Sequence, residues 1–446
     1  MFESVLVANR GEIARRVIRT AQRMGLRAVA VHSEVDSGLP YVDEADEAVL
    51  IGPAAPAESY LDTDAVLEAA RRSGADAVHP GYGFLSESAE FARQVQDAGL
   101  VWVGPAPESI ARMGDKVSAR NLMAEAGVPV AAGTPDPVHD VGTAVTAADK
   151  IGYPLMVKAA AGGGGIGMGV ATDEDGLRAA FETARSRAER FFGDPAVLLE
   201  RYVTSARHVE VQIIGLADGR VVALGERDCS VQRRHQKVAE ESPSPGVSPE
   251  LRARMIDAAV RAGEAVDYEN AGTVEFLVDR SRPGEFFFLE MNTRLQVEHP
   301  VTELVTGIDL VEQQLLVAAG EPPSFDPAAV APSGHALELR VYAEDPVRFL
   351  PGPGKITEWD EPHGPGVRVD SGYRAGNTVT PHYDPLLAKL CVHGPDRAAA
   401  LEGARAAVAG FGLAGPRHNL PFFTELLGNP EFVAGDYDTG LVTRMR

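Results

Sequence analysis

The chain has 446 residues, of which 45% are hydrophobic and 24% charged, a balance typical of a folded globular protein with two or three domains. Its 64 acidic and 42 basic residues give a net charge of −22, which argues against a nucleic acid or an anionic membrane as partner, because both need basic surface. Two cysteines exclude a disulfide framework, and without a leader pattern or a bilayer-length apolar run the expected location is the reducing cytoplasm.

The first hundred residues alternate between strand and helix patterns. This rhythm predicts a parallel sheet covered by helices on both faces. The first strand–helix turn, Asn9-Arg10-Gly11, lacks the three spaced glycines of a dinucleotide fingerprint, so NAD is not expected there. Strands are expected at 4–8, 27–32, 47–51, 76–79 and 100–104, and helices at 12–24, 63–72 and 88–98.

A Pro-rich stretch at 128–140 predicts a linker into a second unit, and another at 321–332 a linker into a third. The second unit combines a strand, a glycine loop, a long helix and two antiparallel hairpins. The overall prediction is therefore α/β followed by α+β. The expected elements are strands at 154–160 and 196–202, a helix at 173–192, hairpins 209–214/221–224 and 273–278/285–291, and C-terminal strands at 336–342 and 386–392.

Six glycines fall within the eight positions 162–169, directly after a strand that ends near Lys158. Such a run cannot form a stable helix or strand interior, but its free N–H groups can cover a phosphate chain as a lid. It is not a Walker loop, because no Gly-Lys-Ser/Thr closes it. The alternative is a flexible linker, although linkers usually contain serine and do not follow a buried strand ending in lysine.

Lysine is rare in this chain. Arginine supplies 36 of the 42 basic residues, so a retained lysine indicates a need for a compact ammonium group that arginine's planar fork cannot imitate. Chance placement remains open for any single lysine. The six lysines are Lys116, Lys150, Lys158, Lys237, Lys355 and Lys389.

A row of polar residues follows the apolar run 286–289. In an extended chain alternate side chains share a face, so the polar members of 290–298 are expected to point one way and Met291, Leu295 and Val297 the other. A solvated edge is the alternative, disfavoured by the buried strand that precedes the row. The polar members are Glu290, Asn292, Arg294, Gln296 and Glu298.

Glu275, on the strand expected to pair with this row, adds a second inward carboxylate. Two carboxylates and an amide beside a phosphate loop are the hard oxygen ligands that Mg²⁺ prefers. Arg294 is suited to clamp a planar oxyanion with two hydrogen bonds. The segment 227–237 carries five basic groups, which fits an anion pocket or a basic surface equally well. Cys229 is expected to be a packed thiol, and His79 a hydrogen-bonded turn residue.

Together these segments resemble the biotin carboxylase component of the biotin-dependent carboxylases, in the ATP-grasp superfamily. The resemblance covers essentially the whole chain. It implies an ATP-grasp fold with an N-terminal Rossmann-like domain (1–115), an ATP-grasp domain (116–320) with a mobile glycine-rich lid at about 130–203, and a biotin carboxylase C-terminal domain (334–441). The ordered motifs are 5–14, 79–87, 113–116, the glycine loop, 227–237, 290–300 and 340–346.

The resemblance also implies roles for matching residues. ATP would contact Lys116, Lys158, Gly163, Gly164, Gly165, Glu200, His208, Gln232, His235, Glu275 and Glu290. Mg²⁺ or Mn²⁺ would be held by Glu275, Glu290 and Asn292, and bicarbonate by Lys237, Arg294, Gln296 and the backbone of Val297. Biotin would contact Tyr82 and Arg340, and the catalytic residues would be Glu298 as general base, Arg340, Arg294 and Lys237.

The implied activity is ATP- and bicarbonate-dependent carboxylation of biotin through carboxyphosphate, the first half-reaction of an acetyl-CoA or acyl-CoA carboxylase. No biotin-attachment motif occurs, so biotin is expected on a carrier protein or carrier domain, with a carboxyltransferase subunit as a further partner and a homodimer as the assembly. Ile166 stands where the family loop has a cation, which suggests weaker ATP binding. The alternatives are another ATP-grasp ligase, for example one acting on urea, and a non-catalytic subunit.

Overall fold

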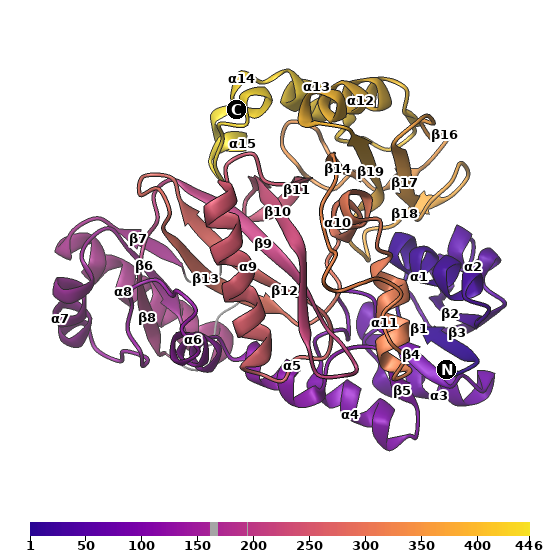
Figure 1. Cartoon of the computed structure of the whole chain (residues 1–446), viewed down its shortest axis with the longest axis horizontal. Coiled ribbons are helices and arrows are strands. Elements are labelled where there is room, and N and C mark those ends of the chain that lie inside the picture. Colours follow the sequence, from indigo (N-terminus) through magenta and orange to yellow (C-terminus); the bar gives the residue numbers. More distant parts are fainter. Residues whose placement is uncertain (161–167, 194) are drawn as a thin grey trace.

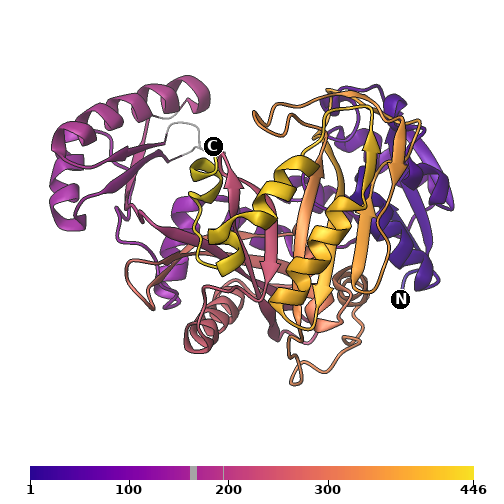
Figure 2. The ribbon, with the colours of Figure 1, turned by 90° about the horizontal axis from the view of Figure 1, so that it is seen from above.

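The computed structural model describes residues 1–160, 168–193 and 195–446, and within them three sheets organise the molecule. A parallel sheet near the N-terminus and a small antiparallel sheet lie on opposite sides of a large central sheet (Figure 1). The view from above shows the same separation of the two outer parts (Figure 2). Of the residues predicted to bind ATP, Gly163, Gly164 and Gly165 lie outside the described residues, as does Ile166.

The N-terminal sheet has the order β3-β2-β1-β4-β5, with all pairs parallel. Val5 and Val7 pack into one apolar cluster with α1, and Leu6 packs into another with α3 and α4, so both faces are buried as predicted. The elements are β1 (Ser4–Val7), α1 (Gly11–Arg23), β2 (Arg27–Ser33), α2 (Pro40–Glu44), β3 (Glu47–Gly52), α3 (Thr63–Ser73), β4 (Ala77–His79), α4 (Ala89–Asp97) and β5 (Val101–Trp102).

The small antiparallel sheet, in the order β7-β6-β8, forms a lobe with its own apolar core. Its helices α7 and α8 pack on that sheet and lie far from the N-terminus (Figures 1 and 2). The Pro-rich stretch 128–140 has no regular helix or strand, as predicted. The elements of the lobe are α7 (Val141–Ile151), β6 (Leu155–Ala159), β7 (Gly169–Ala171), α8 (Glu174–Phe192) and β8 (Val197–Arg201). The two helices before it, α5 (Pro107–Gly114) and α6 (Lys116–Glu125), pack against β13 (Phe286–Asn292) of the central sheet.

The central sheet has eight strands in the order β13-β12-β9-β10-β11-β14-β19-β17. Because β11 pairs with β14, one continuous sheet runs through both the second and the third predicted units. Both predicted hairpins are present, β9 with β10 and β12 with β13. The strands are β9 (Ala206–Gly215), β10 (Val221–Arg233), β11 (Gln236–Ser242), β12 (Asn270–Asp279), β13 (Phe286–Asn292), β14 (His335–Tyr342), β17 (Val367–Ser371) and β19 (Leu386–Gly394).

Helices pack against this sheet and form the last part of the chain. Among the described residues no helix is long and apolar enough to cross a membrane. The helices are α9 (Pro249–Glu264), α10 (His299–Thr306), α11 (Leu310–Ala318), α12 (Arg397–Ala409), α13 (Leu420–Gly428), α14 (Pro430–Ala434) and α15 (Leu441–Arg444). Short strands complete the C-terminal part: β15 (Gly354–Lys355), β16 (Glu358–Asp360), β18 (Thr378–Val379) and β20 (Gly412–Ala414).

One local prediction was wrong: the extended row 290–298 stops being a strand at Asn292, and a turn leads from there into α10 at His299. The segment 227–237, for which no strand or helix was predicted, forms the end of β10 and the start of β11. Its two-residue turn places Arg234 (φ 48°) and His235 (φ 67°) in the left-handed region that such turns require and that glycine or asparagine usually supplies, so the sequence carried no turn signal there.

Glu241, on β11, ties the central sheet to the C-terminal helices. Its buried carboxylate is 2.6 Å from His335 Nε2 and 2.6 Å from Arg397 Nε, and it accepts a hydrogen bond from the Tyr437 hydroxyl. Burial alone would raise the pKa of Glu241, but the bonds from His335 and Arg397 lower it to about 2. The ionised carboxylate therefore stabilises the fold above the usual pKa of 4.5 and loses this effect as the pH falls toward 2.

We expect Glu241→Gln to lower the free energy of unfolding at pH 7 by about 3 kcal/mol, the equivalent of the pKa difference. The loss should shrink as the pH falls from 5 to 3, because the Glu241 carboxyl is then protonated in the unfolded wild type while it stays ionised in the folded protein, where its pKa is about 2. Denaturant unfolding of both proteins across this range measures the effect, with exposed Glu402→Gln as control. A difference that stays constant with pH would contradict the assignment.

Candidate active site

A cavity of about 900 Å³ lies where the N-terminal sheet, the small lobe and the central sheet meet. Every predicted site residue that the structure describes lines this one cavity. They are Tyr82, Lys116, Lys158, Glu200, His208, Gln232, His235, Lys237, Glu275, Glu290, Asn292, Arg294, Gln296, Val297, Glu298 and Arg340. Residues separated by more than 250 positions in the chain thus form one site.

Lys237 stands at the centre of a buried group of carboxylates. Its Nζ lies 2.6 Å from Glu210 Oε2, 2.8 Å from Glu275 Oε1 and 2.7 Å from Glu298 Oε1. Burial by itself would lower the pKa of this ammonium, but the three carboxylates raise it well above its ordinary value. Lys237 is therefore a permanent cation, and its charge is shared among three anions.

Glu298 joins two cations. Its Oε1 contacts Lys237, and its Oε2 accepts a hydrogen bond of 2.9 Å from Arg340 Nη2. Burial would raise the pKa of Glu298, yet Lys237 and Arg340 hold it well below its usual range. The carboxylate is consequently ionised at neutral pH and able to accept a proton.

Arg340 is itself fixed by a second carboxylate. Its Nη2 lies 2.7 Å from Glu240 Oε1, and both side chains are buried. Despite burial, Glu240 and Glu298 raise the pKa of Arg340 well above normal. The guanidinium is thereby held at the cavity wall with its charge intact.

Glu275 and Glu290 are directly opposed across β12 and β13, so their side chains share a face. Asn292, two residues beyond Glu290, lies on the same side and donates 2.9 Å to Glu275 Oε1. Glu275 Oε2 is also 2.8 Å from His208 Nε2. Two carboxylates and an amide oxygen provide the hard ligands that Mg²⁺ requires, and this donor set fits the ion.

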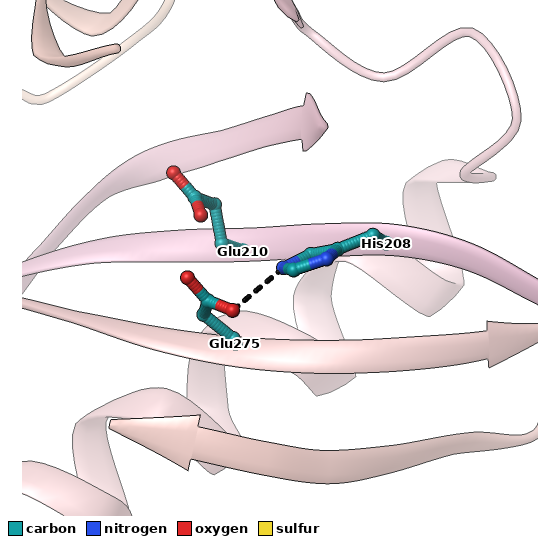
Figure 3. A group of neighbouring side chains, drawn as sticks. All are labelled: His208, Glu210 and Glu275. Atoms are coloured by element: carbon teal, nitrogen blue, oxygen red, sulfur yellow. Dashed lines mark ion pairs between the residues drawn. The ribbon is translucent and has the colours of Figure 1, made fainter. Parts of the chain in front are cut away.

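His208, Glu210 and Glu275 form a second group with metal-ligand chemistry. Figure 3 shows His208 and Glu210 on one strand and Glu275 on its neighbour, with the Glu275 carboxylate turned toward His208. The ammonium of Lys237 contacts both carboxylates, so a protein cation already balances their charge. This group is therefore held together by Lys237 and His208 without needing a metal.

Two more lysines extend along the cavity toward the small lobe. Lys158 Nζ lies 2.6 Å from Glu200 Oε1, and Lys116 Nζ lies 3.8 Å from Glu290 Oε2. Lys158 is on β6, directly before the glycine loop, and Lys116 begins α6. The arrangement places two ammonium groups on the side of the cavity where a phosphate chain was predicted.

The guanidinium of Arg294 is held in position by neighbouring side chains. It donates 2.9 Å to Gln296 Oε1 and 3.1 Å to Asn292 Oδ1, and its Nε lies 3.0 Å from Glu87 Oε2. Gln296 lies in the turn after β13, Asn292 is the last residue of that strand, and Glu87 lies in the segment between β4 and α4. The turn brings the alternating polar residues into the cavity even though the predicted strand geometry was wrong.

Neither alternative given for 227–237, an anion pocket or a basic surface, describes the whole segment. Arg227 is fully buried behind the cavity, where it donates to Glu210, Gln212 and Thr273, and Arg233 pairs with Glu344. His235 and Lys237 do reach the cavity. Alternation does not explain the split. Arg227 is directly opposed to Glu210, and Glu210 to Glu275, so Arg227 shares the sheet face of the cavity carboxylates. It is covered there by α10, where it donates a 3.0 Å hydrogen bond to Thr302.

The expectations for Cys229 and His79 were confirmed. Cys229 is a buried thiol 3.7 Å from Glu298 Oε1, and His79 accepts a 3.0 Å hydrogen bond from the backbone N–H of Gly81. The sequence prediction missed Glu210 and Glu240, which complete the charge network. Alternation along β9 from His208 was a usable signal for Glu210, whereas Glu240 is recognisable only once β11 is known to pair with β14.

Apolar cavity residues were also missed. Met156, Leu277 and Leu289 line the wall near Lys158 and His208, and Leu289 keeps 40% of its surface exposed. A large exposed leucine on an otherwise buried strand is typical of a surface that covers a flat apolar ligand. The sequence predicts a buried strand for the whole run 286–289, so this exposed leucine was not expected.

Three family models together match most of the chain. Residues 1–110 match the model of the biotin carboxylase N-terminal domain, 115–324 that of the carbamoyl-phosphate synthase L chain ATP-binding domain, and 338–444 that of the biotin carboxylase C-terminal domain. The chain is 50% identical to the biotin carboxylase of Halalkalibacterium halodurans, covering 99% of this chain and 98% of that protein. It is 48% identical to biotin carboxylase 2 of Bacillus subtilis, covering 98% of each.

Solved structures agree with these matches. A Campylobacter jejuni biotin carboxylase complex with β,γ-ATP has a TM-score of 0.95 at 42% identity, covering 100% of this chain and 99% of that one. The biotin carboxylase domain dimer of Hydrogenobacter thermophilus 2-oxoglutarate carboxylase, with MgADP, ADP and bicarbonate, has a TM-score of 0.93 at 40% identity, covering 100% and 98%. The expected ATP-grasp architecture is thereby confirmed.

Proposed function

The chain belongs to the biotin carboxylase family, and from this membership and its cavity we propose that it carboxylates carrier-bound biotin with ATP and bicarbonate. One observation carries the proposal. Glu298 places one oxygen on Lys237 and the other on Arg340, so a single carboxylate joins the predicted bicarbonate and biotin sides of the cavity. A reaction that transfers CO₂ from the bicarbonate side to the biotin side needs a group that contacts both sides.

In the first step, Lys237, Arg294, Gln296 and the Val297 backbone bind bicarbonate. Glu298 takes the bicarbonate proton while a bicarbonate oxygen attacks the γ-phosphorus of ATP, and the bond from that phosphorus to ADP breaks. Bound bicarbonate shares Lys237 with Glu298, which weakens the ion pair and makes the carboxylate a better base. The products are ADP and carboxyphosphate.

The phosphate chain would be neutralised by protein cations and metal. Glu275, Glu290 and Asn292 would hold Mg²⁺ or Mn²⁺, which supplies charge stabilisation to the transferring phosphoryl group. Lys116 and Lys158 add two ammonium groups, and Glu200, His208, Gln232 and His235 would contact the nucleoside. We assign Gly163, Gly164 and Gly165 to the phosphates from their sequence pattern alone, as a lid that excludes water.

In the second step, carboxyphosphate breaks down to CO₂ and phosphate. The phosphate removes the proton from the biotin ureido nitrogen, and that nitrogen forms a bond to the carbon of CO₂. Arg340 would stabilise the negative charge that develops on the ureido oxygen, and Tyr82 would contact the ring. Glu240 and Glu298 hold Arg340 ready for this task, at 2.7 and 2.9 Å.

The partners follow from the same proposal. We assign the chain to the first half-reaction of an acetyl-CoA or acyl-CoA carboxylase, with a biotin carboxyl carrier protein or domain and a carboxyltransferase subunit. The segments 340–346 and 382–389 support this branch. A homodimer and a cytoplasmic location complete the proposal, with domain limits at 1–115, 116–320 and 334–441. Two buried, unpaired thiols agree with a reducing compartment.

The direct test is ADP release by the purified chain with Mg²⁺ and ATP. We expect release to require bicarbonate and to rise with free biotin, because Glu298 acts only when bicarbonate is bound. Bicarbonate-dependent release that ignores biotin but responds to urea would indicate a different acceptor. ATP binding without release under any condition would contradict the proposed activity.

A further inference from the structure

Lys389 is a fully buried lysine behind the cavity wall. It lies on β19, and its side chain has 0% exposure. It is directly opposed to Arg340 on β14 and to Asp370 on β17, so these three side chains share one face of the sheet. That face is turned toward the turn after β13 and the start of α1.

The ammonium of Lys389 joins three parts of the chain. Its Nζ donates a 3.0 Å hydrogen bond to the Val297 carbonyl and lies 3.0 Å from Glu12 Oε2 and 3.9 Å from Asp370 Oδ2. Val297 precedes the proposed base Glu298. The ion pair with Glu12 connects the C-terminal part of the sheet with the first turn of α1 in the N-terminal domain.

Glu12 also contacts Tyr82. The Tyr82 hydroxyl donates a hydrogen bond to Glu12 Oε1, while Lys389 contacts Oε2 of the same carboxylate. Burial raises the pKa of Glu12, and Lys389 opposes that effect. Glu12, Tyr82 and Val297 all line the cavity. The buried ammonium of Lys389 therefore contacts two parts of the cavity wall, Val297 directly and Tyr82 through Glu12.

Close packing fixes these elements. A Cβ at Gly372, just after β17, would lie 2.6 Å from the Glu12 backbone nitrogen, so the chain after β17 presses directly on the start of α1. A compact ammonium with three donors suits such a space, whereas the planar guanidinium of arginine does not. This accounts for a lysine at 389 in a chain that otherwise prefers arginine.

We propose that Lys389 is a positioning residue that holds the Val297 peptide on the bicarbonate side and, through Glu12, the Tyr82 hydroxyl on the biotin side. The inference rests on the proposed function. Lys389 does not itself touch substrate: it fixes two groups that do. The nucleotide side, around Lys116, Lys158 and Glu200, has separate contacts.

The test is steady-state ADP release by Lys389→Met, with KM measured for ATP, bicarbonate and biotin. We expect kcat/KM for bicarbonate and for biotin each to fall about tenfold, the effect of one charge-assisted hydrogen bond, while KM for ATP changes less than twofold. The control is Lys355→Met, an exposed lysine in the same part of the chain. A purely structural role would change thermal stability and the amount of active enzyme, but not this division among substrates.

Glu12→Gln tests the biotin side alone, and keeps the test decisive if Lys389→Met does not fold. It should lower kcat/KM for biotin and leave kcat/KM for bicarbonate near the wild-type value, because Lys389 still holds Val297. If the wild type is active but both variants keep its kinetic constants, the inference is overturned and the proposed function stands. The same holds if KM for ATP rises as much as KM for bicarbonate and biotin. Wild type without bicarbonate-dependent release would contradict the proposed function, and the inference with it.

Discussion

Glu298→Gln is expected to lower kcat for bicarbonate-dependent ADP release by about 10²- to 10⁴-fold, the usual contribution of a general base. Glutamine has nearly the same shape, but its single amide oxygen can accept a hydrogen bond from Lys237 or from Arg340 and not from both, and it cannot take the bicarbonate proton. KM for ATP should stay within about twofold, because the groups proposed to bind the nucleotide do not contact Glu298.

The matched control for this variant is Glu425→Gln, a surface substitution of the same kind. Single-turnover measurements with saturating ATP and bicarbonate separate the chemical step from product release. A variant that keeps kcat within threefold of the wild type would show that another group accepts the proton. Glu210 would then be the first residue to examine, because its buried carboxylate shares Lys237 with Glu298.

Lys237→Met is expected to lower kcat/KM for bicarbonate by about 10³-fold, since it removes the cation proposed to bind bicarbonate and to balance the transferring charge. The fold should survive. Each carboxylate keeps a second partner, with Glu210 at 2.6 Å from Arg227, Glu275 at 2.8 Å from His208 and Glu298 at 2.9 Å from Arg340. We expect unfolding free energy to fall by about 3 kcal/mol, near the lower limit for breaking a buried ion pair.

Lys237→Arg should restore little of this activity, because a planar guanidinium cannot place its charge on three carboxylates around one point. Lys150→Met, on the exposed surface of α7, is the control for loss of a lysine. Bicarbonate titrations of all three proteins, with denaturant unfolding of each, measure both effects. Near-normal kcat/KM in Lys237→Met would contradict the central position given to this ammonium.

Local pattern was enough to predict the N-terminal sheet, both hairpins and α8, but it predicted no helix after residue 192. The spacing of apolar residues located β1 to β5 to within a few residues, since the inner strands β1, β2 and β4 are buried on both faces. The hairpin turns placed β12 against β13, and Glu275 is opposed to Glu290 as expected. The polar residues of the row 290–298 line the cavity, but the predicted extended strand ends at Asn292. A turn, which alternation of residue types does not predict, brings the later ones into the cavity.

The residues of the candidate site could be found from the sequence because reactive types occur there in dense, ordered motifs that resemble a known family. Their charge state could not. Lys237 has carboxylate partners on β9, on β12 and at the start of α10. Arg227 is buried against Glu210 and does not line the cavity. Ion pairs depend on distances of a few ångströms between segments far apart in the chain.

By itself, the sequence determined the N-terminal sheet, both hairpins, the family and the chemical types available for catalysis, since these depend on local spacing and on motifs. Only the tertiary structure decided that Glu298 bridges Lys237 and Arg340, and that Lys389 is buried against Glu12 and Val297. The physical reason is that burial and electrostatic partnership are set by sheet register and domain packing, which bring together side chains that no local pattern connects.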